Sequence, residues 1–170
     1  MFCIIYEQGL KEKCELSNYE CMFTILSAAA HDIDHPGNNN VYETKNQSKL
    51  AVLYNDVSVL ENHHAASFFF LLENMNYNCN IFQAFSTSLK AEARKMIIEN
   101  ILCTDMSKHF AIQAEIKGIS EMAEGEQDFK GKNKQNLIKC MVHAVDIGNP
   151  TRKFPIAFIW GKKIVQEFFD

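Results

Sequence analysis

Residues 21–40, CMFTILSAAAHDIDHPGNNN, set the architecture: an apolar run of ten residues leads straight into a cluster of titratable groups. Residues 21–30 are apolar on almost every face, which is typical of a helix buried in a core. Just upstream, Ser17 and Glu20 stand three residues apart and fit a capping box, so the helix is expected to begin after Ser17. The Pro-Gly pair at 36–37 is expected to end it.

The rest of the chain repeats the helical pattern. Residues 87–123 have helical composition and predict two helices, or one helix bent around CTDMSKH. Residues 38–48 indicate a polar loop or short broken helices, and 124–134 is the clearest loop. No strand-like alternation stands out. The prediction is a compact all-α domain over residues 1–170, with further helices at 49–55, 58–74, 135–147 and from about 155 to 170.

Composition excludes several classes of protein. An apolar content of 47% in 170 residues allows a sizeable core and excludes a disordered tail. A net charge of −4 lacks the basic footprint of a nucleic-acid-binding protein, so no nucleic acid partner is expected. No apolar stretch approaches the ~20 residues of a membrane span. The six cysteines form no C-x-x-C pair and several lie in apolar runs, which favours a reducing, cytoplasmic location.

Two helix ends carry groups that could bind one metal ion. His31 and Asp32 are adjacent and offer an imidazole and a carboxylate, although a lone His-Asp pair is common by chance. Asp146 ends a second apolar run, MVHAVD at 141–146, just before a Gly-Asn-Pro stop at 148–150. An ionised acid at the end of a buried helix needs a cation or hydrogen-bond donors. We therefore predict that both ends converge, with the two carboxylates close enough to share an ion.

Further polar groups lie inside apolar helical segments. Glu61 and His64 are three residues apart and share a helix face. Thr104 and Asp105 are expected in the middle of a helix, where their side chains compete with the backbone. Taken singly, the first pair predicts a surface ion pair and Thr104 an ordinary helix residue. Taken together, the set favours a functional site.

Four stretches in this order resemble the catalytic domain of class I cyclic nucleotide phosphodiesterases, a branch of the metal-dependent HD hydrolases. They are HDIDHPGNNN (31–40), LAVLYNDVSVLENHH (50–64), ILCTDMSKHF (101–110) and MVHAVDIGNPTRK (141–153), the last followed by Trp160. The resemblance covers about residues 20–170 and corresponds to the middle of the family's domain. His109 also matches a recurring residue, for which we expect a structural role.

The resemblance implies a zinc ion with a magnesium ion beside it, manganese being an alternative at the second site. The zinc ligands that it identifies in this chain are His31, Asp32 and Asp146. The groups that it assigns to the waters of the second ion are His35, Glu61 and Thr104. The residues that it places in the nucleotide pocket are Asn149, Met106 and Ile164.

The implied activity is hydrolysis of cyclic AMP or cyclic GMP to the 5'-monophosphate by a hydroxide held between the two ions. The alternative is a catalytically inactive relative that serves as a binding or regulatory module. A different HD hydrolase is the weakest hypothesis, because the ENHH and TDM segments have no reason to recur there. The sequence does not distinguish cyclic AMP from cyclic GMP.

One departure from the family pattern matters. The family's general acid and first zinc histidine come from a Y-H-N-x-x-H segment upstream of the H-D pair, whereas residues 1–30 contain no histidine. The catalytic proton donor is therefore expected upstream of Met1, and the purine-binding glutamine beyond the last residue. We expect this chain to bind metal weakly and to turn over slowly. We also expect an exposed apolar patch along 21–30 or beside 155–170, unless residues 1–16 fold back as a cover.

Overall fold

In the computed structural model, residues 1–121 and 129–169 are described, and every regular element in these ranges is helical. The prediction of an all-α fold is confirmed. The elements are α1 (Phe2–Tyr6), α2 (Leu10–Lys13), α3 (Asn18–Ala30), α4 (Asn40–Lys45), α5 (Lys49–Leu53), α6 (Val59–Glu73), α7 (Thr87–Leu102), η1 (Met106–Lys108), α8 (His109–Ser120), α9 (Gly131–Asp146), η2 (Asn149–Thr151) and α10 (Phe154–Phe169).

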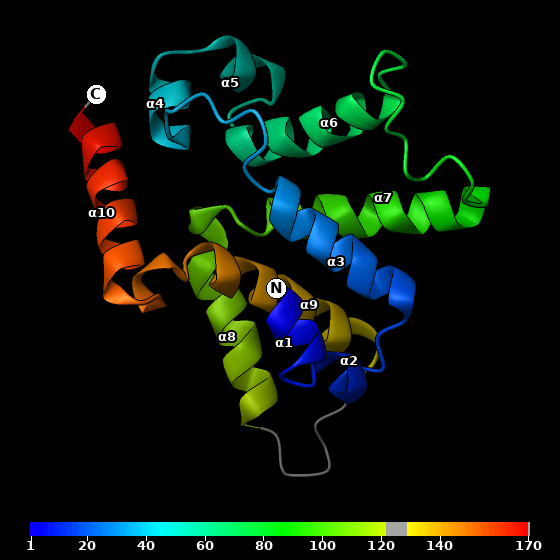
Figure 1. Ribbon diagram of the computed structural model, residues 1–170. Helices are drawn as coiled ribbons and strands as arrows, with labels where there is room; N and C mark the ends of the chain where they lie inside the picture. Colours follow the sequence, from blue (N-terminus) through cyan, green and yellow to red (C-terminus); the bar gives the residue numbers. More distant parts are fainter. Residues whose placement is uncertain (122–128, 170) are drawn as a thin grey trace.

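The larger core lies where α3 crosses α7 and where α6 packs on α7 (Figure 1). Each large apolar side chain that is fully buried in this core, such as Phe23 or Ile97, stabilises the fold by about 1.5–3 kcal/mol relative to an exposed one. A buried hydrogen bond from Asn100 Nδ2 to Ser27 Oγ, 3.2 Å long, fixes α7 against α3 inside this core. The buried members of the core are Phe23, Ala30, Ala65, Phe68, Leu72, Phe82, Ala93, Ile97 and Ile101.

A smaller core covers the other side of α3. The N-terminal helices contribute Ile5 and Leu10, which pack with Cys21 of α3 and Ile138 of α9. The prediction of an exposed patch along 21–30 is therefore wrong, and the stated exception holds: the first sixteen residues fold back over the helix. Ile5 and Cys21 are both fully buried.

The boundaries of α3 follow from local chemistry. The backbone N–H of Ser17 donates to Glu20 Oε2 at 2.8 Å, and the Glu20 N–H donates to Ser17 Oγ at 3.1 Å. The predicted capping box is thus present. The helix ends at Ala30, well before the Pro-Gly pair, and residues 31–34 form a turn in which Asp34, with a φ of +60°, lies in the left-handed region. Aspartate tolerates that conformation better than most residues.

One of the two forms predicted for residues 87–123 is confirmed, because α7 and α8 are separate helices with η1 between them. A second predicted boundary is corrected. The helix α9 begins at Gly131, four residues earlier than the predicted 135, which shortens the loop expected at 124–134. Residues 122–128 of these segments lie outside the described residues.

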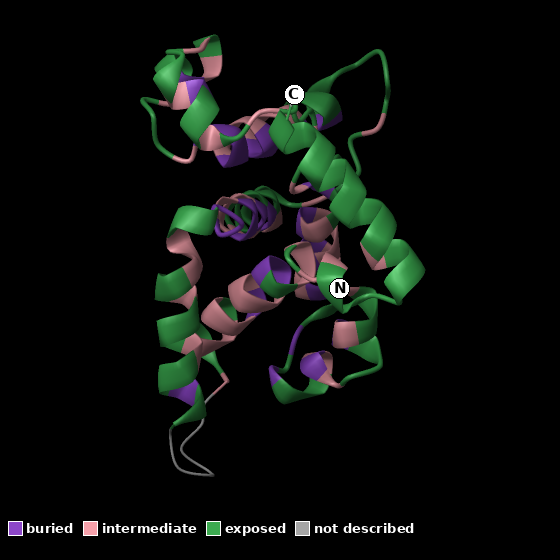
Figure 2. Ribbon diagram, turned by 90° about the vertical axis from the view of Figure 1, so that its left-hand side faces the viewer, coloured by how far each residue is buried: buried purple, intermediate pink, exposed green. Residues whose placement is uncertain are grey.

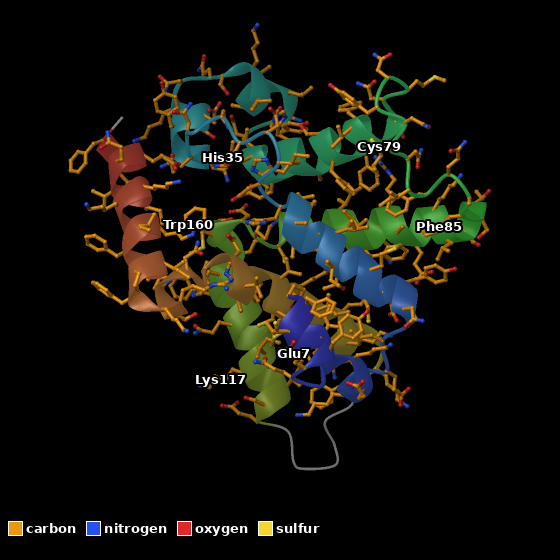
Figure 3. All side chains as sticks on the ribbon, viewed as in Figure 1. Glu7, His35, Cys79, Phe85, Lys117 and Trp160 are labelled. Atoms are coloured by element: carbon orange, nitrogen blue, oxygen red, sulfur yellow. The ribbon has the colours of Figure 1, made fainter. Side chains whose placement is uncertain are left out.

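The helix α10 stands apart from both cores. It has no buried residue, and Figure 2 shows it exposed along its length. Phe154, Phe158 and Phe168 are 76%, 50% and 74% exposed, so the predicted apolar patch beside 155–170 is confirmed. The side chain of Trp160 projects from α10 toward the rest of the molecule (Figure 3). Within the described residues, no helix is long and apolar enough to cross a membrane.

Candidate metal centre

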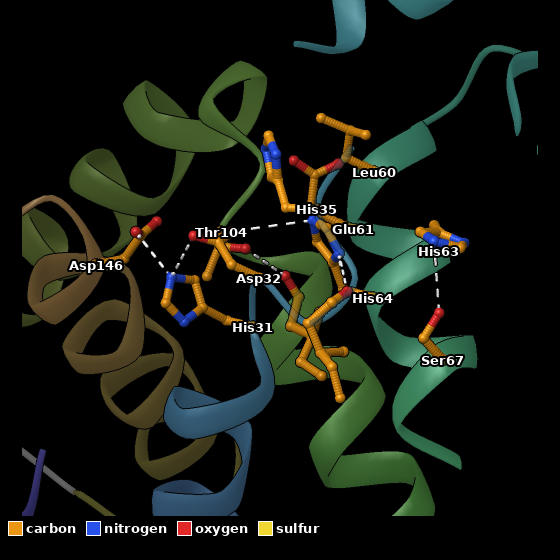
Figure 4. Close-up of polar contacts among 12 residues, drawn as sticks. His31, Asp32, His35, Leu60, Glu61, His63, His64, Ser67, Thr104 and Asp146 are labelled. Carbon is orange, nitrogen blue, oxygen red and sulfur yellow. Dashed lines mark hydrogen bonds and ion pairs between the residues drawn. The ribbon is translucent and has the colours of Figure 1, made fainter. Parts of the chain in front are cut away.

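The ends of α3 and α9 meet at His31. Its Nε2 lies 3.1 Å from Asp146 Oδ1 and 3.2 Å from Asp32 Oδ2. One donor atom from each of the three residues lies within 4.8 Å of the others. The predicted convergence of the Asp32 and Asp146 carboxylates is therefore confirmed (Figure 4). One nitrogen and two carboxylate oxygens at this spacing suit a divalent ion such as zinc.

The orientation of His31 fits a metal ligand. Its Nδ1 lies 2.9 Å from the carbonyl oxygen of Ala28 in the last turn of α3, and donates to it. Histidines that bind metals through Nε2 are commonly oriented in this way by a backbone carbonyl. The imidazole therefore presents Nε2 to the two acids, and its rotation is fixed before any ion binds.

Electrostatics at this point favour a cation. Hydrogen bonds to Asp146 and then to Asp32 raise the pKa of His31 from its usual 6.5 to about 10. The same contact with His31 lowers the pKa of Asp32, against the opposing effect of burial. Without an ion, the His31 proton is the positive charge that holds the two carboxylates together. A divalent ion would replace that proton.

A second group of donors uses the other side of Asp32. Its Oδ1 lies 3.8 Å from His64 Nε2, and Asp32, His35 and His64 form a second cluster whose donor atoms lie within 4.8 Å of one another. The His35 and His64 rings stack with centroids 5.5 Å apart. His64 Nδ1 donates to the Ile33 carbonyl at 2.7 Å, which again leaves Nε2 facing the acid. Burial lowers the pKa of His64, so its imidazole is neutral and able to act as a ligand.

Sequence reasoning gave His64 no metal role and overlooked Asn40 entirely. The Asn40 amide donates to both oxygens of Glu61, at 3.1 and 3.0 Å, and its Oδ1 accepts the Leu60 N–H at 2.9 Å. Burial raises the pKa of Glu61, while these hydrogen bonds act against the rise. Glu61 and His64 are both buried, so the surface ion pair that these two residues would predict if taken by themselves is not present. In the sequence, the adjacent histidines at 63–64 could have indicated a metal ligand. Nothing in the sequence distinguishes Asn40 from the two asparagines that precede it.

The placement of Thr104 and Asp105 in mid-helix is also wrong. They lie at the break between α7, which ends at Leu102, and η1. The Thr104 hydroxyl donates to the Ile101 carbonyl at 2.8 Å. Asp105 accepts from Ser58 Oγ at 2.6 Å and from the Ser107 N–H at 2.8 Å. An aspartate that caps the next turn in this way favours a helix break.

A hollow of about 240 Å³ opens beside the first donor cluster. Asn149 lines it, as the nucleotide-pocket hypothesis requires, and so does Trp160 from α10. Met106 and Ile164, the two apolar positions of that hypothesis, do not line this hollow and are 58% and 40% exposed. The full lining is Ala28, His31, Asp32, Val142, Val145, Asp146, Asn149, Arg152 and Trp160.

Several known proteins with similar sequences come from one family. The sequence pattern of the 3'5'-cyclic nucleotide phosphodiesterase family matches residues 1–170. The chain is 37% identical over 164 residues to a 3',5'-cyclic-AMP phosphodiesterase 4C of Rattus norvegicus, and 36% identical to that of Mus musculus. Each alignment covers 91% of this chain, but only 29% of the rat and 23% of the mouse protein.

Solved structures show the same similarity. The phosphodiesterase domain of a rhodopsin fusion protein from the choanoflagellate Salpingoeca rosetta matches with a TM-score of 0.80 and 27% identity. The match covers 90% of this chain and 48% of that domain's chain. The present chain thus spans about half of the solved domain and under a third of the rodent proteins.

Proposed function

This chain belongs to the 3'5'-cyclic nucleotide phosphodiesterase family, and on that premise we propose that it hydrolyses a 3',5'-cyclic nucleotide to the 5'-monophosphate. The observation that carries the proposal is the meeting of His31, Asp32 and Asp146 at the ends of two helices far apart in sequence. The rodent relatives are named for cyclic AMP, so cyclic AMP is the first substrate to assay and cyclic GMP the second.

The donor chemistry supports two different ions. His31 Nε2 and the carboxylates of Asp32 and Asp146 form a mixed nitrogen and oxygen set that suits zinc. The Asp32 carboxylate also belongs to the second cluster and would supply an oxygen ligand to magnesium or manganese, whose remaining ligands would be waters and not the imidazoles of His35 and His64. Such ions, when bound, withdraw charge from the phosphodiester oxygens and lower the pKa of water.

The surrounding residues would position water and substrate. Glu61 is held by the Asn40 amide and lies buried, so it offers a fixed carboxylate edge for hydrogen bonds from water. His35, through its own ring nitrogen, and Thr104, through its hydroxyl, are the other water-holding groups in this proposal. Asn149, in the hollow beside the donors, supplies an amide for the nucleotide, and Trp160 an aromatic face.

The test is an assay of the protein expressed from its complete gene, with cyclic AMP and cyclic GMP, before and after treatment with a chelator. We expect hydrolysis that is lost with the chelator, returns with divalent ions, and falls by at least about 100-fold in Asp32→Asn and Asp146→Asn. Binding of cyclic nucleotide without hydrolysis would instead identify an inactive binding module. Hydrolysis that is unchanged in both variants would overturn the proposed site.

A separate assay of the 170-residue chain tests the supply of the leaving-group proton. Its first thirty residues contain no histidine, so that part of the sequence supplies neither a further imidazole ligand nor an imidazole acid for the leaving 3' oxygen. Loss of a general acid commonly lowers the rate by about 10²–10⁴-fold. We expect metal binding that is measurable and turnover that is slow or undetectable.

A further inference from the structure

The helices α8 and α9 are joined by two histidines outside the donor clusters. His109, the first residue of α8, places Nδ1 2.9 Å from Nε2 of His143 in α9. The ring centroids are 5.2 Å apart with an angle of 45° between the planes. His143 is 3% exposed, so the contact lies inside the protein and away from solvent.

Packing alone does not explain a histidine at position 143. Its Nδ1 is buried and has no hydrogen-bond partner of normal geometry within the described residues. Burial lowers the pKa of His143 and the neighbouring His109 lowers it further, whereas the charge of Asp146 and then the Cys103 backbone act in the opposite direction. His143 is therefore neutral, and one of the two rings donates the shared proton. An apolar side chain would fill the same space without leaving a buried nitrogen unsatisfied.

The contact connects the helix that carries Asp146 with the segment that carries Thr104. His143 and Asp146 are three residues apart in the last turns of α9 and so lie on neighbouring parts of one face. On the other side, His109 directly follows η1, and the break at 103–105 that carries Thr104 directly precedes η1. The Cys103 thiol lies at one further point of contact with α9, because its Sγ is 3.2 Å from the Lys139 carbonyl oxygen and 2.9 Å from that of Asn100, and its one proton can be donated to either.

On the basis of the proposed function, we propose that the His109–His143 pair is a positioning element of the metal centre. The hydrogen bond sets the rotation of the last two turns of α9 about the helix axis, and thereby the direction in which Asp146 faces His31. The same hydrogen bond holds the segment that carries Thr104 beside these last two turns of α9. The pair neither binds the ion nor touches the substrate.

The test uses two amides that differ by one methylene group. The amide of His143→Gln reaches the position of Nε2 and can hydrogen-bond to His109, whereas that of His143→Asn replaces only Nδ1 and cannot. The probe is Co²⁺ alone, titrated into the metal-free 170-residue chain at one fixed pH. Its visible absorption reports both the affinity and the ligand geometry.

We expect His143→Gln to bind Co²⁺ within about threefold of the wild type, and His143→Asn to bind about 10–100-fold more weakly with an altered spectrum. The matched control is Cys103→Ala, which removes the other contact between the break and α9 but leaves the histidine pair. Circular dichroism confirms that each variant is folded.

Equal affinities for the Gln and Asn variants would overturn the inference, as would an equal loss in Cys103→Ala, which would indicate general loosening of α9. A wild-type chain that binds no Co²⁺ would overturn the proposed metal site and this inference with it. Normal wild-type binding with unaffected variants would overturn this inference alone.

Discussion

His31 Nε2 and Asp146 Oδ1 lie 3.1 Å apart and join the end of α3 to the end of α9 across 115 residues of sequence. Because Asp32 lies on the same nitrogen at 3.2 Å, the imidazole is held between two acids. These three residues therefore contribute to the stability of the fold, to the protonation of His31 and to the binding of a cation. Each of these can be measured separately.

The ion-free chain should owe part of its stability to the His31 proton. The pKa of His31 is raised from 6.5 to about 10 on folding, so its stabilising effect is complete below pH 6.5 and is lost as the pH rises through about 10. In the presence of a chelator, His31→Gln should lower the free energy of unfolding by about 1.5–3 kcal/mol at pH 6. The difference should shrink above pH 10. Urea denaturation at the two pH values measures it, and a difference independent of pH would contradict the assignment.

Metal binding should depend on Asp146 far more than on another nearby acid. Asp146→Asn keeps the shape of the side chain but removes a charged donor, and should weaken zinc binding by about 10–100-fold in a calorimetric titration. Asp34→Asn is the matched control, since Asp34 pairs with His63 at 2.9 Å and belongs to neither donor cluster. Zinc binding should also release protons, because the ion displaces the proton of His31. Equal losses in the two variants would show that the chain responds to total charge rather than to a site.

The sequence was sufficient for the fold class and for the first donor cluster, for a physical reason. Helix periodicity and the capping box at Ser17 are local properties, so the sequence predicts the helical class and the start of α3. Asp32 and Asp146 each end an apolar helix, where an unpaired charge is costly, so their convergence could be inferred without coordinates.

Other features depend on tertiary packing, which has no local signature. Ile5 packs with Cys21 in the smaller core. Helical periodicity is a property of each segment by itself, so it does not predict this contact. The exact place of the break at Thr104 depends on Ser58, which donates to Asp105 from 47 residues away in the sequence, so the sequence predicts a bend or break around CTDMSKH but not that Thr104 and Asp105 lie in it. Asn40 acquires its role only because α4 lies beside α6.

The Asn40 amide should stabilise the charged form of Glu61. Removing it in Asn40→Ala leaves a buried carboxylate without its two donors, which should cost about 1–3 kcal/mol at pH 7. Burial raises the pKa of Glu61, and loss of the amide should raise it further, so the cost should be smaller near pH 4, where Glu61 is protonated. The second variant is Glu61→Gln, combined with Asn40→Ala in a double-mutant cycle. A coupling energy near zero at pH 7, from chemical denaturation, would show that the contact contributes nothing.

The aromatic face of α10 should be a surface rather than a support of the fold. Phe158 and Phe168 are 50% and 74% exposed and no residue of the helix is buried, so Phe158→Gln with Phe168→Gln should change the free energy of unfolding by no more than about 0.5 kcal/mol per site. The same changes should reduce binding of a dye that fluoresces on exposed apolar surface, because side chains gathered along one helix form a contiguous patch. Phe23→Ala in the core is the opposite control and should cost about 3–5 kcal/mol. A large loss of stability in the α10 variants would mean that this helix packs against the domain in solution, and unchanged dye binding would place the apolar surface elsewhere.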